Sequence, residues 1–440
     1  MFTKEELINI TGAQVLKDDI SNDADLCLST DTRTISFGDI YLPLKGASFD
    51  GEDFIEAAIE KGSKAYFTTK DVVYDGAELV LKVENTLDSY LKIAQYYREK
   101  INPITVGITG SSGKTTTKEL VYSVLSQKFK TQKTYLNHNN EIGFCQTVLS
   151  MKSDTQALIV EMGMRGLGEI ELITSHLKPN YAIITNCGSA HVGRLGSLDN
   201  IAIAKCEIAK GLMHNGVFIG LDQDIMKKHL DYSGKKIFYS LKDVNIIEQL
   251  KSYSKFEYKG KLYELNVEGE YNIENSLSAI ELGLELGLSY EEIRAGLASY
   301  RPIEKRWEMV CVNGLNLIND SYNANPESVK ASVKTFVDLY SNPVVVLGDM
   351  CELGDESAIY HRQVGEYLAR SNHNVKYLTV GKYASEIAKV LNNSGFDAKA
   401  FDNNKDVSCY IVENLNNSNT IFLKASRAMK FEEIIENIKK

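Results

Sequence analysis

Residues Ile104–Leu120 read ITVGITGSSGKTTTKEL, and this stretch decides the fold of the central part of the chain. An apolar, β-branched run leads into a Gly/Ser turn and then into residues that favour a helix, which predicts a strand, a phosphate-binding loop and a helix. The amide groups of such a turn and the amino end of the helix cradle polyphosphate. Lys114 would reach the terminal phosphates and Thr115 would hold Mg²⁺, so the stretch predicts binding of a nucleoside triphosphate.

The loop departs from the general pattern G-x-x-x-x-G-K-[ST], which requires glycine where this chain has Ile108. The first glycine is instead Gly110, which gives the tighter form T-G-x-x-G-K-T-T. The predicted nucleotide-binding residues of the loop are Thr109, Gly110, Ser111, Ser112, Gly113, Lys114, Thr115 and Thr116.

Composition indicates a globular, acidic, intracellular protein. The 440 residues suffice for two to four domains, and the net charge of −10 argues against a general nucleic-acid or anionic-membrane surface. The seven cysteines are widely spaced and odd in number, which favours reduced, mostly buried thiols. The amino-terminal residues lack the pattern of a signal peptide, and no apolar run approaches the ~18 residues of a membrane span. We therefore expect a cytoplasmic location.

Three blocks of alternating strands and helices follow one another along the chain. Residues 1 to about 100 contain short strands and helices, and Asn102-Pro103 marks a boundary before the phosphate-loop strand. The central block contains buried strands, a predicted helix over Ser197–Met213 and a hairpin over Lys255–Val267. The alternation restarts at about residue 313 and predicts mostly parallel sheets covered by helices on both faces. Ligands of such sheets bind beyond the carboxyl ends of the strands.

Several polar side chains stand at these strand ends. Glu161 closes the strand ALIVE and is placed to ligate Mg²⁺ directly or through water. His191 follows another strand, and its imidazole could bind a metal, although a loop histidine alone is more often structural. Lys205 lies in the middle of a predicted helix and, taken alone, reads as a solvated lysine.

Two further segments carry groups suited to a nucleotide. Asn272 and Asn275 lie one turn apart at the start of a helix, where their amides suit an adenine edge or simply cap the helix. The polar turn DSYNANP, Asp320–Pro326, follows a strand, and Arg306 could neutralise a transferring phosphoryl group or be a surface charge.

Taken together, these segments resemble the Mur ligase family of ATP-dependent amide ligases over nearly the whole chain. The motifs in family order are TGSSGKTTT, EMG, TN…AH…GS, AKCEI, YNIEN and NDSYNANP. LNHNNEIGF, NDSYNANPESV and LKASRAM are most similar to the family members that add D-alanyl-D-alanine to UDP-N-acetylmuramoyl-tripeptide.

The resemblance implies an α/β protein of three domains. These are an N-terminal α/β uridine-nucleotide domain (1–100) that binds the UDP-muramyl-peptide, a central P-loop parallel-sheet ATPase domain (101–312) and a C-terminal Rossmann-like α/β ligase domain (313–440). A monomer that forms an acyl-phosphate intermediate in peptidoglycan precursor synthesis is expected.

The resemblance also implies roles for single residues. Lys114 would bind the ATP phosphates, Thr115 and Glu161 a first Mg²⁺, and His191 a second Mg²⁺ together with Lys205 as a carbamate. The residues implied around the nucleotide in addition to the loop are Asn275, Arg306, Asp320 and Asn323. The residues implied around the muramyl peptide are Thr30, Asp31, Arg33, Asn139 and Asn140.

The segment around Ser426 and Arg427 follows the strand Thr420–Leu423, and we expect it to receive D-alanyl-D-alanine. Arg427 can bind a carboxylate through two parallel hydrogen bonds, and Ser426 can add a hydroxyl donor. A basic turn that only caps the last helix is the alternative. For the whole chain, the open alternatives are a diamino-acid-adding Mur ligase, a folylpolyglutamate synthetase, a P-loop kinase and a non-catalytic nucleotide-binding protein.

Overall fold

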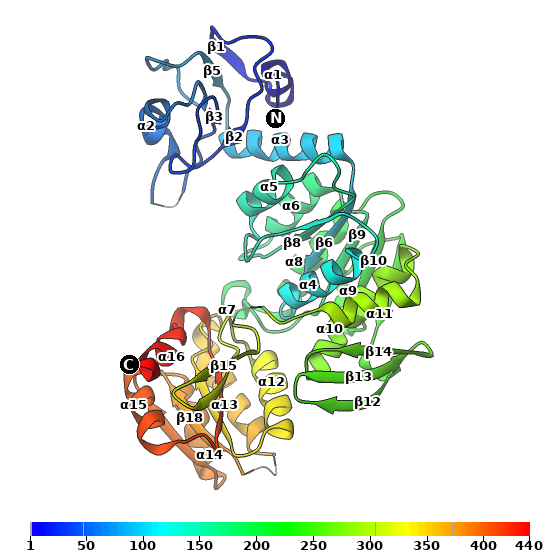
Figure 1. Ribbon diagram of the computed structural model, residues 1–440, viewed down its shortest axis with the longest axis vertical. Helices are drawn as coiled ribbons and strands as arrows, with labels where there is room; N and C mark the ends of the chain where they lie inside the picture. The colour runs from blue at the N-terminus through cyan, green and yellow to red at the C-terminus, as the bar shows by residue number, and fades with distance from the viewer. Residues whose placement is uncertain (1, 47, 304, 372–373) are drawn as a thin grey trace. The chain divides into compact units, whose positions relative to one another are not determined.

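The computed structural model describes residues 2–46, 48–303, 305–371 and 374–440 and contains two compact units (Figure 1). One unit comprises the residues up to Pro103 together with Thr134–Thr155, and the other comprises Ile104–Lys133 with Gln156–Lys440. The predicted boundary near Asn102-Pro103 coincides with the change of unit. Asn102 ends a helix in the left-handed conformation, at φ 52°. The division into three domains at 100 and 312 stays a prediction.

The first unit is built on a five-stranded sheet with the order β1-β5-β4-β3-β2. Its strands are β1 (Gln14–Asp18), β2 (Leu28–Ser29), β3 (Ile40–Tyr41), β4 (Ala65–Thr68) and β5 (Leu79–Lys82), all parallel except β1. Its helices are α1 (Lys4–Thr11), α2 (Ile55–Glu60), α3 (Thr86–Ile101) and α5 (Glu141–Leu149). Helix α5 packs against α3. The stretch Thr134–Thr155, which the sequence assigns to the central block, therefore shares its compact unit with the amino-terminal sheet.

The second unit begins with a six-stranded, all-parallel sheet of the order β11-β10-β9-β6-β8-β7. Its strands are β6 (Ile104–Thr109), β7 (Thr131–Lys133), β8 (Ala157–Glu161), β9 (Tyr181–Ile184), β10 (Val217–Leu221) and β11 (Lys235–Tyr239). Helices α4 (Lys114–Leu125), α10 (Glu270–Glu285) and α11 (Tyr290–Ser299) pack on one another, and α6 (Glu169–Leu177), α8 (Leu198–Cys206) and α9 (Asp224–His229) complete the cover. The order places β6 between β8 and β9, so the phosphate loop adjoins the ends of both neighbours.

The predicted hairpin over Lys255–Val267 is present as β13 (Tyr253–Tyr258) and β14 (Lys261–Leu265), joined to β12 (Val244–Leu250) in an antiparallel sheet.

The predicted helix over Ser197–Met213 is longer than the helix that the structure contains. Helix α8 ends at Cys206 and a 3₁₀ turn covers Glu207–Gly211. The Glu207 carboxylate accepts from the N–H of Gly168 at 2.7 Å, and Thr174 donates to the Ile208 carbonyl at 3.0 Å, so contacts with α6 redirect the last turns.

The last block contains a six-stranded sheet of the order β15-β16-β20-β17-β18-β19. Its strands are β15 (Glu308–Val312), β16 (Leu315–Asn319), β17 (Pro343–Gly348), β18 (Lys376–Val380), β19 (Asp397–Phe401) and β20 (Thr420–Lys424). Only the edge strand β15 is antiparallel to its neighbour. The helices are α12 (Pro326–Leu339), α13 (Ser357–Leu368), α14 (Ala384–Asn393), α15 (Asn404–Asn414) and α16 (Glu432–Lys439). Apolar side chains of β17 and β20 form the core with α15 and α16.

The thiols are all free, but the expectation that most are buried is wrong. Cys145, Cys187 and Cys206 are buried, whereas the other four are exposed because they lie on outward positions such as the edge strand β15.

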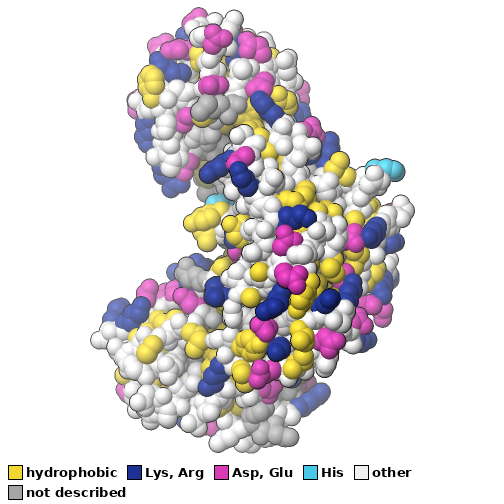
Figure 2. Space-filling view, turned by 45° about the vertical axis from the view of Figure 1, so that its right-hand side comes forward, with side chains coloured by type: hydrophobic (Ala, Val, Ile, Leu, Met, Phe, Trp, Pro, Cys, Tyr) yellow, Lys and Arg dark blue, Asp and Glu magenta, His cyan; other side chains and the backbone are white. Residues whose placement is uncertain are grey.

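Within the described ranges, none of the helices combines the length and apolar character needed to cross a bilayer. Figure 2 shows basic and acidic side chains interspersed over the face that it draws, so binding of a strongly anionic ligand there would depend on local groups.

Candidate active site

The phosphate loop is held in a conformation that requires both of its glycines. Gly110 has φ 151°, and a Cβ there would lie 1.8 Å from the Thr185 hydroxyl oxygen. Gly113 has φ 78°, and a Cβ there would lie 2.3 Å from Oδ1 of Asn275. Asn186 accepts from the N–H of Ser112 at 3.0 Å. The end of β9 and helix α10 therefore brace the loop, and only glycine allows that approach.

Lys114 opens helix α4, and its ammonium group donates to the Gly110 carbonyl at 2.8 Å. The lysine side chain therefore folds back over the loop. Burial is the largest influence on this group and lowers the pKa of Lys114 from its usual value, while Glu161 acts in the opposite direction. The side chain remains partly accessible to solvent, so a bound phosphate could reach it.

Thr115 and Glu161 meet as the parallel strand order predicts. The Thr115 hydroxyl donates to Oε1 of Glu161 at 3.2 Å, and Arg306 donates through Nη2 to the same hydroxyl at 2.9 Å. Glu161 is only 2% exposed and forms an ion pair with the equally buried Lys118 at 3.4 Å. A hydroxyl and a carboxylate side by side are oxygen donors of the kind that Mg²⁺ prefers.

His191 and Lys205 lie beyond β9 in strongly desolvated surroundings. His191 has a left-handed backbone, at φ 68°, and its Nδ1 is 3.2 Å from a carboxylate oxygen of Glu352. Burial, and then the nearby cations Lys205 and Lys114, lower the pKa of His191 to about 3. The ring is therefore neutral at pH 7. A neutral imidazole keeps a lone pair on one nitrogen, which is the form that binds a metal.

Lys205 is completely buried, and its ammonium nitrogen has no hydrogen-bond partner among the described residues. Burial lowers the pKa of Lys205 well below its ordinary value, with a smaller contribution from Lys114. Burial thus favours the uncharged amine of Lys205 over its ammonium form, and the amine is the form that reacts with carbon dioxide. Its neighbour Cys206 directs its thiol to the Met226 carbonyl, at 3.8 Å.

The two predicted amides of α10 take different positions. Asn275 is 7% exposed and accepts from the Thr117 hydroxyl at 3.4 Å, next to Gly113 at the start of α4. Asn272 is buried and donates to the Glu268 carbonyl at 2.6 Å. The Asn275 side chain therefore lies against the phosphate loop, and its contact with adenine stays a prediction.

Residues of the last block surround the carboxyl ends of β16 and β20. Lys424 is 4% exposed and forms a 2.6 Å ion pair with Asp320, which ties the two strand ends together. The Ser426 hydroxyl is buried and accepts from the N–H of Cys351 at 2.9 Å. Arg427 and Asn323 are exposed. The direct binding roles predicted for Ser426, Arg427 and Asn323 stay predictions.

The residues predicted to bind the muramyl peptide all lie in the first unit. Arg33 donates through Nη2 to the Asp31 carboxylate at 2.7 Å, which lowers the pKa of Asp31 to about 2. Thr30 hydrogen bonds to the buried Tyr90 of α3. Asn140 caps α5 and accepts from the N–H of Gly143 at 3.0 Å, directly after Asn139. Packing of α5 on α3 thus keeps Asn139 and Asn140 in the same compact unit as Thr30, Asp31 and Arg33.

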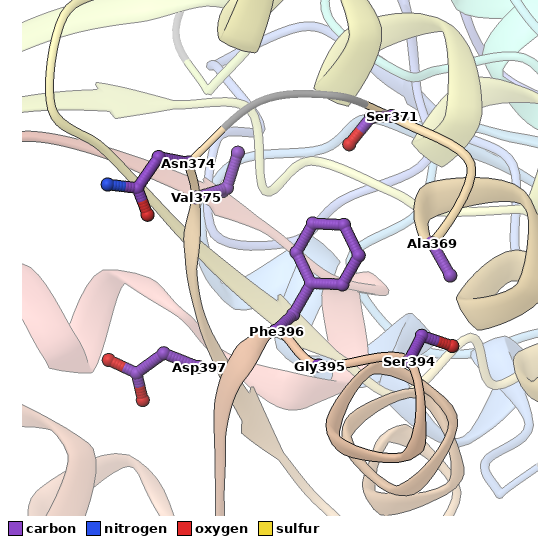
Figure 3. A pocket seen from close by; sticks show the side chains of 8 residues that line it. All are labelled: Ala369, Ser371, Asn374, Val375, Ser394, Gly395, Phe396 and Asp397. Atoms are coloured by element: carbon purple, nitrogen blue, oxygen red, sulfur yellow. The ribbon is translucent and has the colours of Figure 1, made fainter.

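Sequence reasoning gave no role to three side chains of this region, namely Lys118, Tyr322 and Glu352. Lys118 was detectable in part, because it stands one helical turn beyond Lys114 and Thr115 on the same face of α4. The other two depend on contacts between distant segments. A surface pocket lined by Asn374, Phe396 and neighbouring residues is separate from this region (Figure 3). It lies at the amino ends of β18 and β19, whereas the site residues stand at carboxyl ends.

Comparisons with known proteins match this arrangement along the chain. Family models match at residues 27–98 (Mur ligase family, catalytic domain), 108–283 (Mur ligase middle domain) and 305–427 (Mur ligase, glutamate ligase domain). The UDP-N-acetylmuramoyl-tripeptide–D-alanyl-D-alanine ligase of Bacillus subtilis is 34% identical over 93% of this chain and 92% of that protein. The Escherichia coli ligase of the same name is 30% identical over 98% and 97%.

A crystal structure of MurF from Acinetobacter baumannii superposes with a TM-score of 0.92 at 28% identity, and covers 100% of this chain and 99% of that one. The similarity thus extends over the sheets of both units and not over the phosphate loop alone. On these grounds the chain belongs to the Mur ligase family.

Proposed function

We propose that this chain joins D-alanyl-D-alanine to UDP-N-acetylmuramoyl-tripeptide in peptidoglycan precursor synthesis, at the expense of ATP. The relatives described above carry this activity in their names and align with nearly the whole chain. The observation that carries the proposal is the edge where Lys114, Thr115 and Glu161 meet beside the buried Lys205 and His191. This edge unites phosphate-binding groups with candidate metal ligands.

The side chains at this edge could hold two Mg²⁺ ions only if a hydroxyl, an imidazole and a modified lysine act as ligands beside the Glu161 carboxylate. Within the described ranges, no cluster of three or more His, Cys, Asp or Glu side chains could hold a metal. Thr115 and Glu161 would hold one ion, and the remaining positions would fall to phosphate oxygens and water. His191 and a carbamate on Lys205 would hold the second, and the orphaned Lys205 nitrogen supports that modification. Bound Mg²⁺ would supply positive charge to the phosphate oxygens.

The proposed reaction has two steps. A carboxylate oxygen of the tripeptide terminus attacks the γ-phosphorus of ATP, the bond to the β-γ bridging oxygen breaks, and ADP leaves. Lys114, the loop amides and Arg306 would offset the negative charge of the phosphoryl group. The amine of D-alanyl-D-alanine then attacks the acyl carbon, a proton is lost, the amide forms, and inorganic phosphate departs.

The substrate residues would divide between the two units. Thr30, Asp31, Arg33, Asn139 and Asn140 would face the UDP-muramyl peptide. Asn275, Asp320 and Asn323 would contact the nucleotide, and Ser426 with Arg427 would receive the dipeptide carboxylate. Exposure of Arg427 supports that assignment, because its guanidinium is accessible to a ligand. A cytoplasmic monomer stays a prediction.

The proposal is tested by phosphate release from a panel of substrates. We expect turnover with ATP, Mg²⁺, UDP-N-acetylmuramoyl-tripeptide and D-alanyl-D-alanine together, and only background release when either co-substrate is omitted. Activity with UDP-N-acetylmuramoyl-dipeptide and a diamino acid instead would assign the chain to the diamino-acid-adding branch. ADP formation with one co-substrate alone would indicate a kinase, and activity with folate and glutamate would indicate a folylpolyglutamate synthetase.

A further inference from the structure

Tyr322 lies in the turn after β16, within cation–π range of two guanidinium groups. The Arg306 Cζ is 4.1 Å from the centroid of its ring, and the Arg427 Cζ is 6.0 Å from the same centroid. Both distances fall in the range at which an aromatic ring attracts a cation. One side chain therefore joins two arginines that are far apart in the sequence.

The two arginines have different surroundings. Arg306 donates to the Thr115 hydroxyl of the phosphate loop at 2.9 Å, so its guanidinium stands on the nucleotide side. Arg427 follows β20, which pairs with β16 in parallel, and its side chain is exposed. The ends of these two strands meet, which places Tyr322 between the phosphate loop and the exposed arginine.

The surrounding contacts hold the backbone of the turn that carries the ring. The N–H of Tyr322 donates to the Lys305 carbonyl at 3.1 Å, and the preceding Ser321 hydroxyl donates to Asn319 at 2.6 Å. Lys424 donates to the Asp320 carboxylate and ties the same turn to β20. A ring carried on a fixed turn can restrict two long arginine side chains before any ligand binds, so less side-chain entropy is lost on binding.

We propose that Tyr322 is a positioning residue that orients Arg306 and Arg427 together and thereby couples the nucleotide site to the site for the dipeptide carboxylate. The inference rests on the proposed function and adds a residue to which that function gives no role. Without the ring, each guanidinium must be ordered by its own ligand, and both substrates bind more weakly.

The test compares Tyr322→Leu, which removes the ring, with Tyr322→Phe, which keeps it. We expect Tyr322→Leu to raise the KM for the dipeptide and the KM for ATP by about tenfold each, the scale of a partly desolvated cation–π contact. Tyr322→Phe should stay within about threefold of the wild type. Tyr367→Leu is the matched control, because Tyr367 carries a cation–π contact with Lys330 on the surface and should leave both constants unchanged.

A double-mutant cycle separates positioning from a general structural defect. If Tyr322 acts through Arg427, Tyr322→Leu should change the KM for the dipeptide by less than about threefold in an Arg427→Ala background. Full additivity, a change in only one of the two KM values, or equal damage by Phe and Leu would overturn the proposal.

Failure of the proposed function is recognised separately, because the wild type would then show no turnover with the dipeptide. The coupling proposal falls with it. The Arg306 contact is still tested by fluorescent ADP, whose Kd must rise about fivefold or more in Tyr322→Leu and not in Tyr322→Phe.

Discussion

Replacement of His191 by asparagine should make the stability of the protein less dependent on pH. Asparagine tolerates the left-handed backbone at this position and cannot take up a proton. The pKa of His191 is about 3 in the fold against an ordinary value of 6.5, so the unfolded chain binds a proton first as the pH falls. The contribution of the buried neutral ring is complete above pH 6.5 and is lost progressively from there down to about pH 3.

The expected magnitude follows from the two pKa values. Between pH 8 and pH 5 the wild type should lose about 2 kcal/mol of unfolding free energy through this residue, and about 5 kcal/mol once the pH is below 3. His191→Asn should lack that loss. Burial is the largest cause of the lowered pKa of His191, although the Glu352 carboxylate lies 3.2 Å from its Nδ1.

The assay is equilibrium urea unfolding at pH 8, 6 and 5, followed by the fluorescence of the single tryptophan, Trp307, which is buried in the second unit. Buffers should be depleted of carbon dioxide so that Lys205 carries no carbamate. Values at pH 8 serve as the internal reference for each variant. Equal losses between pH 8 and pH 5 in the wild type and His191→Asn would refute the reasoning.

Four further substitutions test the site. Lys114→Ala should abolish phosphate release with unchanged circular dichroism, and more than a tenth of wild-type turnover at saturating ATP would reject the phosphate-loop assignment. Lys205→Ala should be nearly inactive and partly rescued by short-chain carboxylates; with ¹³C-bicarbonate, a carbamate resonance is expected in the wild type alone, and its absence there would count against carbamylation. Arg427→Ala should raise the KM for the dipeptide about tenfold and leave that for ATP nearly unchanged, whereas the reverse pattern would move Arg427 to the nucleotide side. Lys118→Met should lower the unfolding free energy by about 3–5 kcal/mol because it removes one partner of a buried ion pair with Glu161, whereas a loss below about 1 kcal/mol in urea unfolding would contradict that role.

The sequence by itself determined the phosphate loop and its neighbours. A strand, two glycines that the backbone requires and a lysine-threonine pair at a helix start are local features, and each is visible in Ile104–Leu120. The meeting of Thr115 with Glu161 was also predictable, because parallel strands end at one edge of a sheet.

Only the tertiary structure decided which charged side chains became buried partners and which segments share a unit. Three contacts join segments that are too far apart in the chain for a helix or strand repeat to relate them. They are Lys118 with Glu161, Tyr322 with Arg306, and α5 with α3. Helix α8 likewise ends early because α6 supplies the polar partners of Glu207 and Ile208. Local patterns fix backbone conformation and the direction of a side chain, but a partner across the sheet depends on strand order, which a single segment does not encode.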